Sequence, residues 1–418
     1  MSLTPFRDAV ALVLNLAGER RLPAEVCSLS DAVGRVLAQD VMASEMLPAF
    51  HGAALDGFAL ASTLEVSAFA SGTRLAVEGR ILAGEAFFTN CVNSEPHAHR
   101  IMTGAPVPPC AHTVVGKEDV TEAEGVMTLR REIPLGFAVR PIGSDIEPGA
   151  CLARRGERVT PGHALVFAAL GISSVSVTSR PRVAICATGA ELLPADRAEL
   201  PFGSIRDSST PFLLAALRGW GIEATAATTL IDDRAAIEQW LGGLHNTDVV
   251  VTTGGVSVGD ADHLRASLEG VGATIHLHGV AMRPGKPLLI ATLPAAQGGA
   301  IVLALPGNPY ASAAGAHFFV RPCLTALQGG QLPRLCAATV RGHVRTPPGL
   351  TCVWRANARV SAEGRLEVVV HPARDSYRVT AFKETNAWAV VEGTEAGISD
   401  GAGIRVSLDD AFDGGMDE

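Results

Sequence analysis

Short apolar runs of strand length alternate with helical patterns between residues 181 and 328. The runs 182–187, 248–253 and 301–305 each lead into a loop that contains glycine. Strands that alternate with helices favour a mostly parallel sheet with helices on both faces. The carboxyl ends of parallel strands lie at one edge, where such sheets bind ligands. We therefore expect the three loops to lie together at that edge.

The segments on either side of this region show a different pattern of secondary-structure signals. Residues from about 40 to 150 form short strand-like pieces separated by glycine and proline, and the chain beyond Gly329 shows strands only. The 418-residue chain is 47% hydrophobic and 18% charged, which disfavours disorder. Its apolar runs are shorter than the roughly 18 residues that a transmembrane helix needs. The sequence therefore predicts several α/β and β domains and no membrane span.

The net charge limits the ligands that the chain can bind, and the cysteine pattern indicates the cellular compartment in which it works. The chain has 34 basic and 43 acidic residues, a net charge of −9, so it lacks the positive field that nucleic-acid binding requires. An anionic substrate must then be bound by local lysines and arginines. None of the eight cysteines forms a CxxC pair, and scattered single cysteines indicate reduced thiols and a cytoplasmic location.

The loop after the second of the three strands is the most informative. It reads TTGGVSVGDAD over residues 252–262. Glycines after a strand allow backbone N–H groups to approach an anion, and the dipole of the following helix favours negative charge. Asp260 and Asp262 can hold a hydrated Mg²⁺ against a phosphate, although either can also cap the helix. Weaker candidates, each of which also suits a turn or a helix cap, are Asp207, Asp232 and Asp233.

Two further segments combine proline with polar side chains. The turn RPGKP at residues 283–287 fixes two cations in place, because proline restricts φ and glycine opens the backbone. In a chain with a net charge of −9, Arg283 and Lys286 are candidate anion contacts. Asn308 can cap the last helix of the α/β region, but the prolines on both sides of Gly-Asn favour a shaped backbone wall.

Two His-x-His pairs are also present. His97-Ala98-His99 and His276-Leu277-His278 each point two imidazoles to one side of a strand. Such a pair can supply half of a metal site. Because the sequence shows no clear third ligand, a structural role is favoured for both pairs.

Several short motifs follow one another along the chain in a definite order. Intact ones are IMTGAPVP at 101–108, TGGVSVG with Asp262 at 253–262, PGKP at 284–287 and LPGNP at 305–309. Looser ones are GRVLAQDV at 34–41, LDGFA at 55–59, RPIGSDI at 140–146 and TGAEL at 188–192. Together they resemble the molybdopterin molybdenumtransferases, the MoeA-like family that includes the E domain of gephyrin. The resemblance spans roughly residues 5–410.

The resemblance implies a multidomain fold around a central α/β domain that binds molybdopterin through a mostly parallel sheet. A β-rich domain is inserted into an elongated linking domain, and a β-barrel-like domain closes the chain. The implied boundaries are 1–18 for a helix packing on the α/β domain, 19–43 plus 148–180 for the linking domain, 44–147 for the inserted domain, 181–328 for the α/β domain and 329–411 for the C-terminal domain. Family members are homodimers, with the site between the α/β domain of one subunit and the inserted domain of the other.

The resemblance also implies a reaction. Molybdate is delivered to the dithiolene of adenylylated molybdopterin, and AMP leaves in a step supported by Mg²⁺. The implied partners are these two substrates and, by contact, a molybdopterin adenylyltransferase and cofactor-accepting enzymes.

Combined with the residue patterns, the resemblance yields a set of candidate site residues. The catalytic candidates are Asp56, Thr103, Asp145, Glu191, Asp262 and Lys286. The substrate-binding candidates are Gly254, Gly255, Ser257, Gly259, Arg283, Pro306, Asn308, Pro309, Arg355 and Ser376. The Mg²⁺ candidates are Asp260, Asp262 and Glu191.

The chain departs from the family pattern beside Asp56. Residues 51–55 read HGAAL where the family has Asp-Asn-Ser-Ala-Met, and Ser144, Ala190 and Ser209 replace a Glu, an acidic residue and an Asn. An alternative is therefore a degenerate paralogue that binds molybdopterin as a non-catalytic carrier or scaffold. A nucleotide-dependent adenylyltransferase is disfavoured, because those relatives consist of the α/β domain alone.

Overall fold

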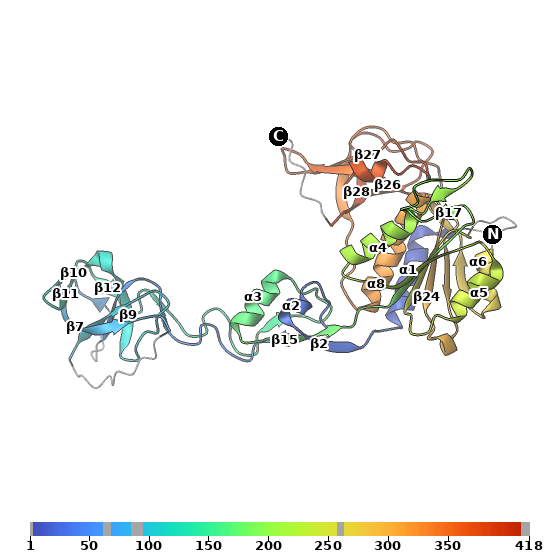
Figure 1. Cartoon of the computed structure of the whole chain (residues 1–418). Helices are drawn as coiled ribbons and strands as arrows, with labels where there is room; N and C mark the ends of the chain where they lie inside the picture. The colour runs from blue at the N-terminus through green and yellow to red at the C-terminus, as the bar shows by residue number, and fades with distance from the viewer. Residues whose placement is uncertain (1–2, 62–67, 85–94, 257–262, 411–418) are drawn as a thin grey trace.

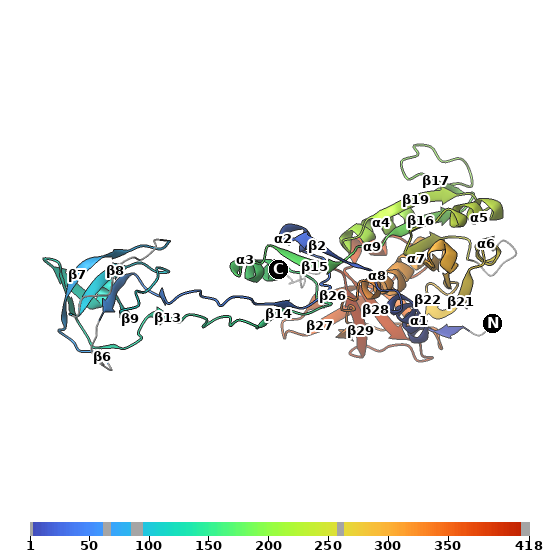
Figure 2. The same ribbon diagram turned by 90° about the horizontal axis from the view of Figure 1, so that it is seen from below.

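The computed structural model describes residues 3–61, 68–84, 95–256 and 263–410. The molecule is elongated, with the inserted β-rich domain at one end and the α/β and C-terminal domains together at the other (Figures 1 and 2). A narrow connection and a small region with helices α2 (Leu29–Ala32) and α3 (Pro161–Ala169) lie between them. None of the described helices is long and apolar enough to cross a membrane.

The mostly parallel sheet predicted for the α/β domain is confirmed. Its strand order is β19-β16-β20-β24-β23-β21, and the first four strands are parallel to one another whereas β23 and β21 are antiparallel to their neighbours. The strands are β16 (Val183–Thr188), β19 (Ala224–Leu230), β20 (Val249–Thr253), β21 (Thr274–His278), β23 (Leu289–Thr292) and β24 (Ile301–Leu305).

Helices cover both faces of this sheet, each over its own apolar core. One core joins the sheet to α1 (Phe6–Gly18), α4 (Ser209–Gly219), α7 (Pro309–Gly315) and α8 (Arg321–Leu327). The other core joins it to α5 (Arg234–Gly242) and α6 (His263–Gly270). The predicted helix at 310–328 consists of α7, a π-helical segment (Ala316–Val320) and α8. The Phe6 ring lies 5.7 Å from the rings of Phe318 and Phe319, so α1 packs on this domain.

The linking region is built from two separate pieces of the chain. β2 (Ala24–Ser28) pairs with β15 (Ser174–Thr178), and β3 (Val41–Met42) pairs with β14 (Cys151–Ala153). The connection continues through β4 (Gly52–Ala53) and β13 (Val139–Arg140) to the inserted domain. This double passage keeps the two ends of the molecule apart (Figures 1 and 2).

The inserted domain contains a six-stranded sheet in the order β10-β11-β7-β8-β5-β9. Separate apolar cores lie against it. Its strands are β5 (Gly57–Ala61), β7 (Arg74–Ile81), β8 (His97–Ile101), β9 (Ala111–Gly116), β10 (Val120–Ala123) and β11 (Val126–Leu129), with a separate pair β6 (Ala68–Phe69) and β12 (Ile133–Pro134). A 3-10 turn, Lys117–Asp119, follows β9.

The C-terminal domain is a closed five-stranded barrel. β26 pairs with both β27 and β28, which closes the order β26-β27-β25-β29-β28. The elements are β25 (Cys336–Val340), β26 (Thr351–Val360), β27 (Leu366–Val370), β28 (Ala387–Glu392), β29 (Gly403–Leu408) and the short helix α9 (Ala381–Glu384). β22 (Val280–Arg283) lies parallel to β26 and, with β1 (Thr4–Pro5), extends the sheet toward the α/β domain.

Candidate active site

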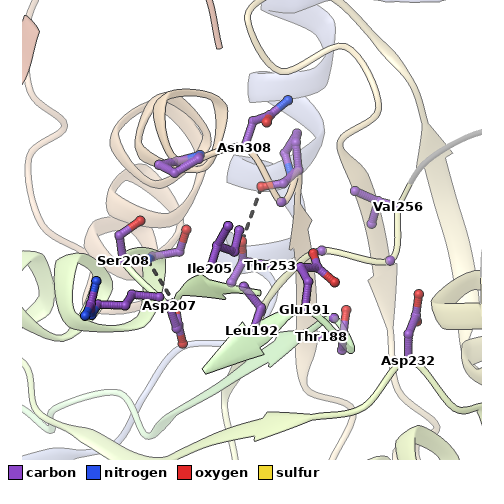
Figure 3. A pocket seen from close by; sticks show the side chains of 18 of the residues that line it. Thr188, Glu191, Leu192, Ile205, Asp207, Ser208, Asp232, Thr253, Val256 and Asn308 are labelled. Atoms are coloured by element: carbon purple, nitrogen blue, oxygen red, sulfur yellow. Dashed lines mark hydrogen bonds between the residues drawn. The ribbon is translucent and has the colours of Figure 1, made fainter. Parts of the chain in front are cut away.

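The carboxyl ends of the three central strands lie at one edge, as the sequence predicts. Ala187 of β16 is level with Thr253 of β20, and Thr253 is level with Leu305 of β24. The loops that follow surround a cavity of about 400 Å³. Figure 3 shows side chains from these loops around it, Glu191 and Asn308 among them. We call this space the strand-end cavity.

Gly254 and Gly255 allow the β20 loop to lie against the end of β16. Both residues have positive φ, 91° and 64°, which glycine adopts without strain. A Cβ on Gly254 would lie 2.2 Å from the carbonyl oxygen of Thr188, so a larger residue does not fit there. Backbone therefore forms this wall of the strand-end cavity, which permits close approach of an anion.

Three oxygen-bearing side chains face the same space. Asp232 Oδ1 and Thr188 Oγ1 are buried and accept or donate no hydrogen bond among the described residues. The exposed carboxylate of Glu191 lines the cavity beside them (Figure 3). A buried polar atom without a partner is costly, so these atoms indicate that the cavity receives a polar ligand, a cation or water.

The other two aspartates that were weaker candidates have structural partners. Asp207 accepts hydrogen bonds from the backbone N–H groups of Ser209 and Thr210, each at 3.0 Å, at the start of α4. Asp233 caps α5 by accepting from the N–H of Ala236 at 2.9 Å. Asp207 still lines the strand-end cavity, but Asp232 is the one of the three whose buried oxygen lacks a described partner.

A second cavity, also of about 400 Å³, adjoins the first and shares the lining residues Pro287, Pro306 and Asn308 with it. We call it the basic cavity, because Arg283, Lys286 and Arg374 line it and Asp375 is the one acidic residue among its described lining residues. Arg374 was not predicted from the sequence, although it is a cation only two residues before the candidate Ser376.

Asn308 joins the α/β domain to the barrel. It occupies the N-cap position of α7, but its side chain makes no capping hydrogen bond. Its Nδ2 instead donates to Ser376 Oγ at 3.0 Å, and the N–H of Tyr310 donates to the Ser376 carbonyl at 3.2 Å. The structure thus brings Asn308, Ser376 and the RPGKP turn together at the basic cavity.

Of the two candidates in the C-terminal domain, Ser376 lines the basic cavity and Arg355 does not. The side chain of Arg355 is buried on β26, and the guanidinium forms an ion pair with Asp409 at 2.6 Å and donates to the Thr385 carbonyl. It also lies 5.3 Å and 5.0 Å from the ring centroids of Phe382 and Trp388. With its donors engaged inside the barrel, Arg355 lines neither cavity and serves the structure instead.

The candidates from the inserted domain and its connection lie far from both cavities within one chain (Figures 1 and 2). Asp56 Oδ1 accepts from both the N–H and the hydroxyl of Thr103 at 2.8 Å, and these bonds lower the pKa of Asp56. Asp145 is exposed and donates its N–H to Leu47 in the connection. One chain alone therefore does not unite these residues with the strand-end cavity.

Four candidates lie outside the described residues. They are Ser257, Gly259, Asp260 and Asp262, which follow the last described residue of the glycine loop, Val256.

Models of known protein families cover almost the whole chain in order. The MoeA N-terminal region (domain I and II) matches residues 4–171, a probable molybdopterin binding domain matches 184–326, and the MoeA C-terminal region (domain IV) matches 337–408.

Relatives match over their full length. A protein of Synechococcus elongatus named molybdopterin molybdenumtransferase is 36% identical over 408 residues, covering 96% of this chain and 98% of that protein. One of Staphylococcus aureus with the same name is 30% identical over 409 residues, covering 97% and 95%. A crystal structure of the molybdopterin biosynthesis MoeA protein of Pyrococcus horikoshii, at 26% identity, superposes with a TM-score of 0.77 over 98% of this chain and 100% of that one.

Proposed function

The chain belongs to the MoeA family of molybdopterin molybdenumtransferases, and we propose that it inserts molybdenum from molybdate into adenylylated molybdopterin with release of AMP. Membership gives it a role in molybdenum cofactor biosynthesis as an enzyme that transfers molybdenum. The details proposed here are the adenylylated substrate, AMP as product, the use of Mg²⁺ and the two-chain site.

The observation that supports this reaction most strongly is the contact between two cavities of different character. The strand-end cavity has a glycine wall and oxygen-bearing side chains, whereas the basic cavity has three cationic side chains. They share Pro287, Pro306 and Asn308. We assign the phosphates of the adenylylated substrate to the strand-end cavity and molybdate to the basic cavity, so that the dithiolene lies at the shared wall.

Lys286 and Arg283 are assigned to the oxyanion. The RPGKP turn holds both at the rim of the basic cavity, where they are exposed, and Arg374 enters from the barrel with its guanidinium 4.8 Å from the Trp354 ring centroid. A guanidinium and an ammonium neutralise a dianion through charge-assisted hydrogen bonds. In a chain of net charge −9, such local cations are what make oxyanion binding feasible.

The strand-end cavity fits a hydrated Mg²⁺ ion. Glu191, Asp232 and Thr188 supply the oxygen ligands that Mg²⁺ prefers, and two of these oxygens are buried without a described partner. Asp260 and Asp262 are proposed to complete the set from the adjoining segment. When bound, Mg²⁺ would neutralise charge on phosphate oxygens and so favour release of AMP.

A homodimer is proposed to complete the site. Asp56, Thr103 and Asp145 would reach the cavities of a second chain, because the connection carries them far from their own (Figures 1 and 2). Large apolar side chains near them are solvent-exposed in the single chain, as expected of a surface that a partner covers. These side chains are Phe50, Leu55, Met102 and Ile142.

The reduced state of the described cysteines supports a cytoplasmic location, which we propose with the reaction. Cys27, Cys110, Cys151, Cys186, Cys323, Cys336 and Cys352 are all free thiols. Disulfides are rare in that compartment.

The carrier or scaffold alternative rests on the altered stretch 51–55. Gly52 and Ala53 are buried in the β4–β13 pair, and the His51 ring accepts from the N–H of Ile142 at 3.2 Å. The stretch thus braces the connection instead of presenting polar side chains to a partner's cavity. This observation favours weakened activity, not a different ligand.

A complementation experiment separates the two functions. The gene is expressed in a strain that lacks its molybdenumtransferase, and nitrate reductase activity is measured at low molybdate. An enzyme restores the activity, whereas a carrier or scaffold does not. Expression of the chain carrying Lys286→Ala, checked for equal protein level, serves as the negative control.

A further inference from the structure

The inserted domain holds a cluster of metal-ligand residues that the proposed reaction does not use. It lies where β7 and β8 pair in parallel. Val77 is opposite Ala98, but Gly79 is opposite His99, so Glu78 is the extra residue of a β-bulge. Val77 packs toward one core, and alternation turns Glu78 to the other face of the sheet.

His97 and His99 project from β8 on that same face. Both are buried, with 5% and 4% of their surface exposed. Their ring centroids are 5.0 Å apart and the rings are nearly perpendicular, at 88°. On the neighbouring strand the residues opposite them are Ala61 and Ala59, whose small side chains leave room for two imidazoles.

The carboxylate of Glu78 completes a set of three ligands. Its Oε2 lies 3.8 Å from His97 Nε2, and the nearest ligand atoms of all three side chains lie within 4.8 Å of one another. The Glu78 side chain is 37% exposed, which gives the cluster access to solvent. The sequence pattern indicates the two histidines but not this third group, because only the bulge brings Glu78 to their face.

The hydrogen bonding of His97 suits metal binding. Its Nδ1 lies 3.0 Å from the carbonyl oxygen of Glu95, and a carbonyl only accepts. Nδ1 therefore donates this hydrogen bond, and Nε2 lies on the side of Glu78. Such a bond to the second ring nitrogen orients the ligand imidazole in most protein metal sites.

The geometry of the cluster favours a bound cation. Both rings are buried, and the nearest ligand atoms of the three side chains lie within 4.8 Å of one another, so one cation between them would engage all three groups.

We propose that Glu78, His97 and His99 bind one Zn²⁺ ion per chain, with water completing the coordination. Two imidazoles and one carboxylate form an established donor set for Zn²⁺. The ion would tie β7 to β8 at the bulge. The proposal does not rest on the reaction at the strand-end cavity, since none of the three residues lines that cavity or is assigned a part in the reaction.

The test is a Zn²⁺ titration of the full-length protein after treatment with a chelator. Bound metal is measured by elemental analysis, and affinity by competition with a chromophoric chelator. Wild type should bind one more Zn²⁺ per chain than His97→Ala or His99→Ala. Glu78→Gln, which keeps the shape of a partly exposed side chain, should weaken this binding roughly tenfold or more.

The second His-x-His pair provides the matched control. His276→Ala removes an exposed histidine of the same motif, whose Nε2 lies 3.0 Å from Thr292 Oγ1, and it should leave the Zn²⁺ stoichiometry unchanged. Added Zn²⁺ should also raise the melting temperature of wild type and His276→Ala more than that of Glu78→Gln. The comparison of wild type and His276→Ala with Glu78→Gln tests the Zn²⁺ site even if His97→Ala or His99→Ala fails to fold.

Equal stoichiometry and affinity in wild type and Glu78→Gln would overturn the proposal. Loss of Zn²⁺ in His276→Ala would also overturn it by placing the site elsewhere. Binding of Fe²⁺ but not Zn²⁺ by the three residues would overturn the choice of ion.

Discussion

At the residue scale, two adjacent aspartates after β19 have opposite surroundings. Asp232 has a buried oxygen without a described partner beside the strand-end cavity, whereas Asp233 caps α5. Groups placed for ligand binding commonly lower the stability of the free protein. Substituting the two aspartates one at a time therefore tests ligand binding with Asp232 and fold stability with Asp233.

We predict that Asp232→Ala leaves the melting temperature unchanged or higher and lowers turnover roughly tenfold or more, the loss expected for one charged contact. The control Asp233→Ala should lower the free energy of unfolding by about 1 kcal/mol, because a helix cap is lost, with little effect on turnover. Thermal melting and AMP release measure the two effects. Full turnover in Asp232→Ala would remove this residue from the site.

Lys286 should matter for molybdate more than for the pterin. Lys286→Ala is expected to raise the KM for molybdate by roughly tenfold or more through loss of a charge-assisted contact worth about 1.5–3 kcal/mol. Lys383→Ala, an exposed lysine on α9 that lines neither cavity, is the control. An unchanged KM for molybdate in Lys286→Ala would place the oxyanion elsewhere.

Asp56 provides a pH-dependent prediction. The N–H and the hydroxyl of Thr103 hydrogen-bond its carboxylate and lower its pKa. The stabilisation they give is therefore present above the ordinary aspartate pKa and is lost as the pH falls through the lowered value. Thr103→Ala removes the hydroxyl and keeps the N–H, so the pKa of Asp56 should rise partway toward its ordinary value. NMR titration of the carboxyl carbon, with Thr121→Ala as control, measures this, and no rise would mean that the hydroxyl bond does not form.

At the scale of elements, the glycine loop tests how closely β16 and the β20 loop must approach. Gly254→Ala would place a Cβ 2.2 Å from the Thr188 carbonyl oxygen, whereas Gly298→Ala, at nearly the same φ, meets nothing within 4 Å. We expect Gly254→Ala to cost about 1–3 kcal/mol more in unfolding free energy than Gly298→Ala. Denaturant unfolding compares them, and equal costs would show that the φ alone matters.

The elements themselves were largely predictable, because periodicity and glycine–proline boundaries mark them locally. The strands β16, β20 and β24 and the common edge of the three loops appear where the sequence places them, whereas the edge strand β19 was not predicted. Partners distant in sequence were not predictable in the same way. Nothing local distinguishes Asp232 from its helix-capping neighbour or reveals that Arg355 pairs with Asp409.

The candidate site shows the same limit. The RPGKP and LPGNP segments both line the basic cavity. Only the family resemblance, and no local sequence pattern, suggested that they would lie together. Two residues were not predicted from the sequence. Arg374 belongs to the C-terminal domain but lines a cavity that it shares with the α/β domain, and Glu78 faces the two histidines only because of a β-bulge. Sequence patterns thus identify the loops, whereas the three-dimensional pairing decides which side chains meet.

At the scale of the whole molecule, the proposed two-chain site can be tested with mixed variants. We predict that Asp56→Ala and Asp232→Ala are each impaired alone, but that a refolded equal mixture regains roughly a quarter of wild-type activity. Half of the randomly formed dimers then carry one intact site of two. Gel filtration with light scattering checks that dimers form. No recovery in mixed dimers would show that both residues act within one chain.

The most direct measurement of the proposed reaction is AMP release by the purified protein. Adenylylated molybdopterin is supplied with and without molybdate and with and without Mg²⁺, and AMP and metallated cofactor are quantified together. The two products should appear in equal amounts, and only when both molybdate and Mg²⁺ are present. Binding of molybdopterin by an intact dimer without either product would contradict catalysis and identify a carrier.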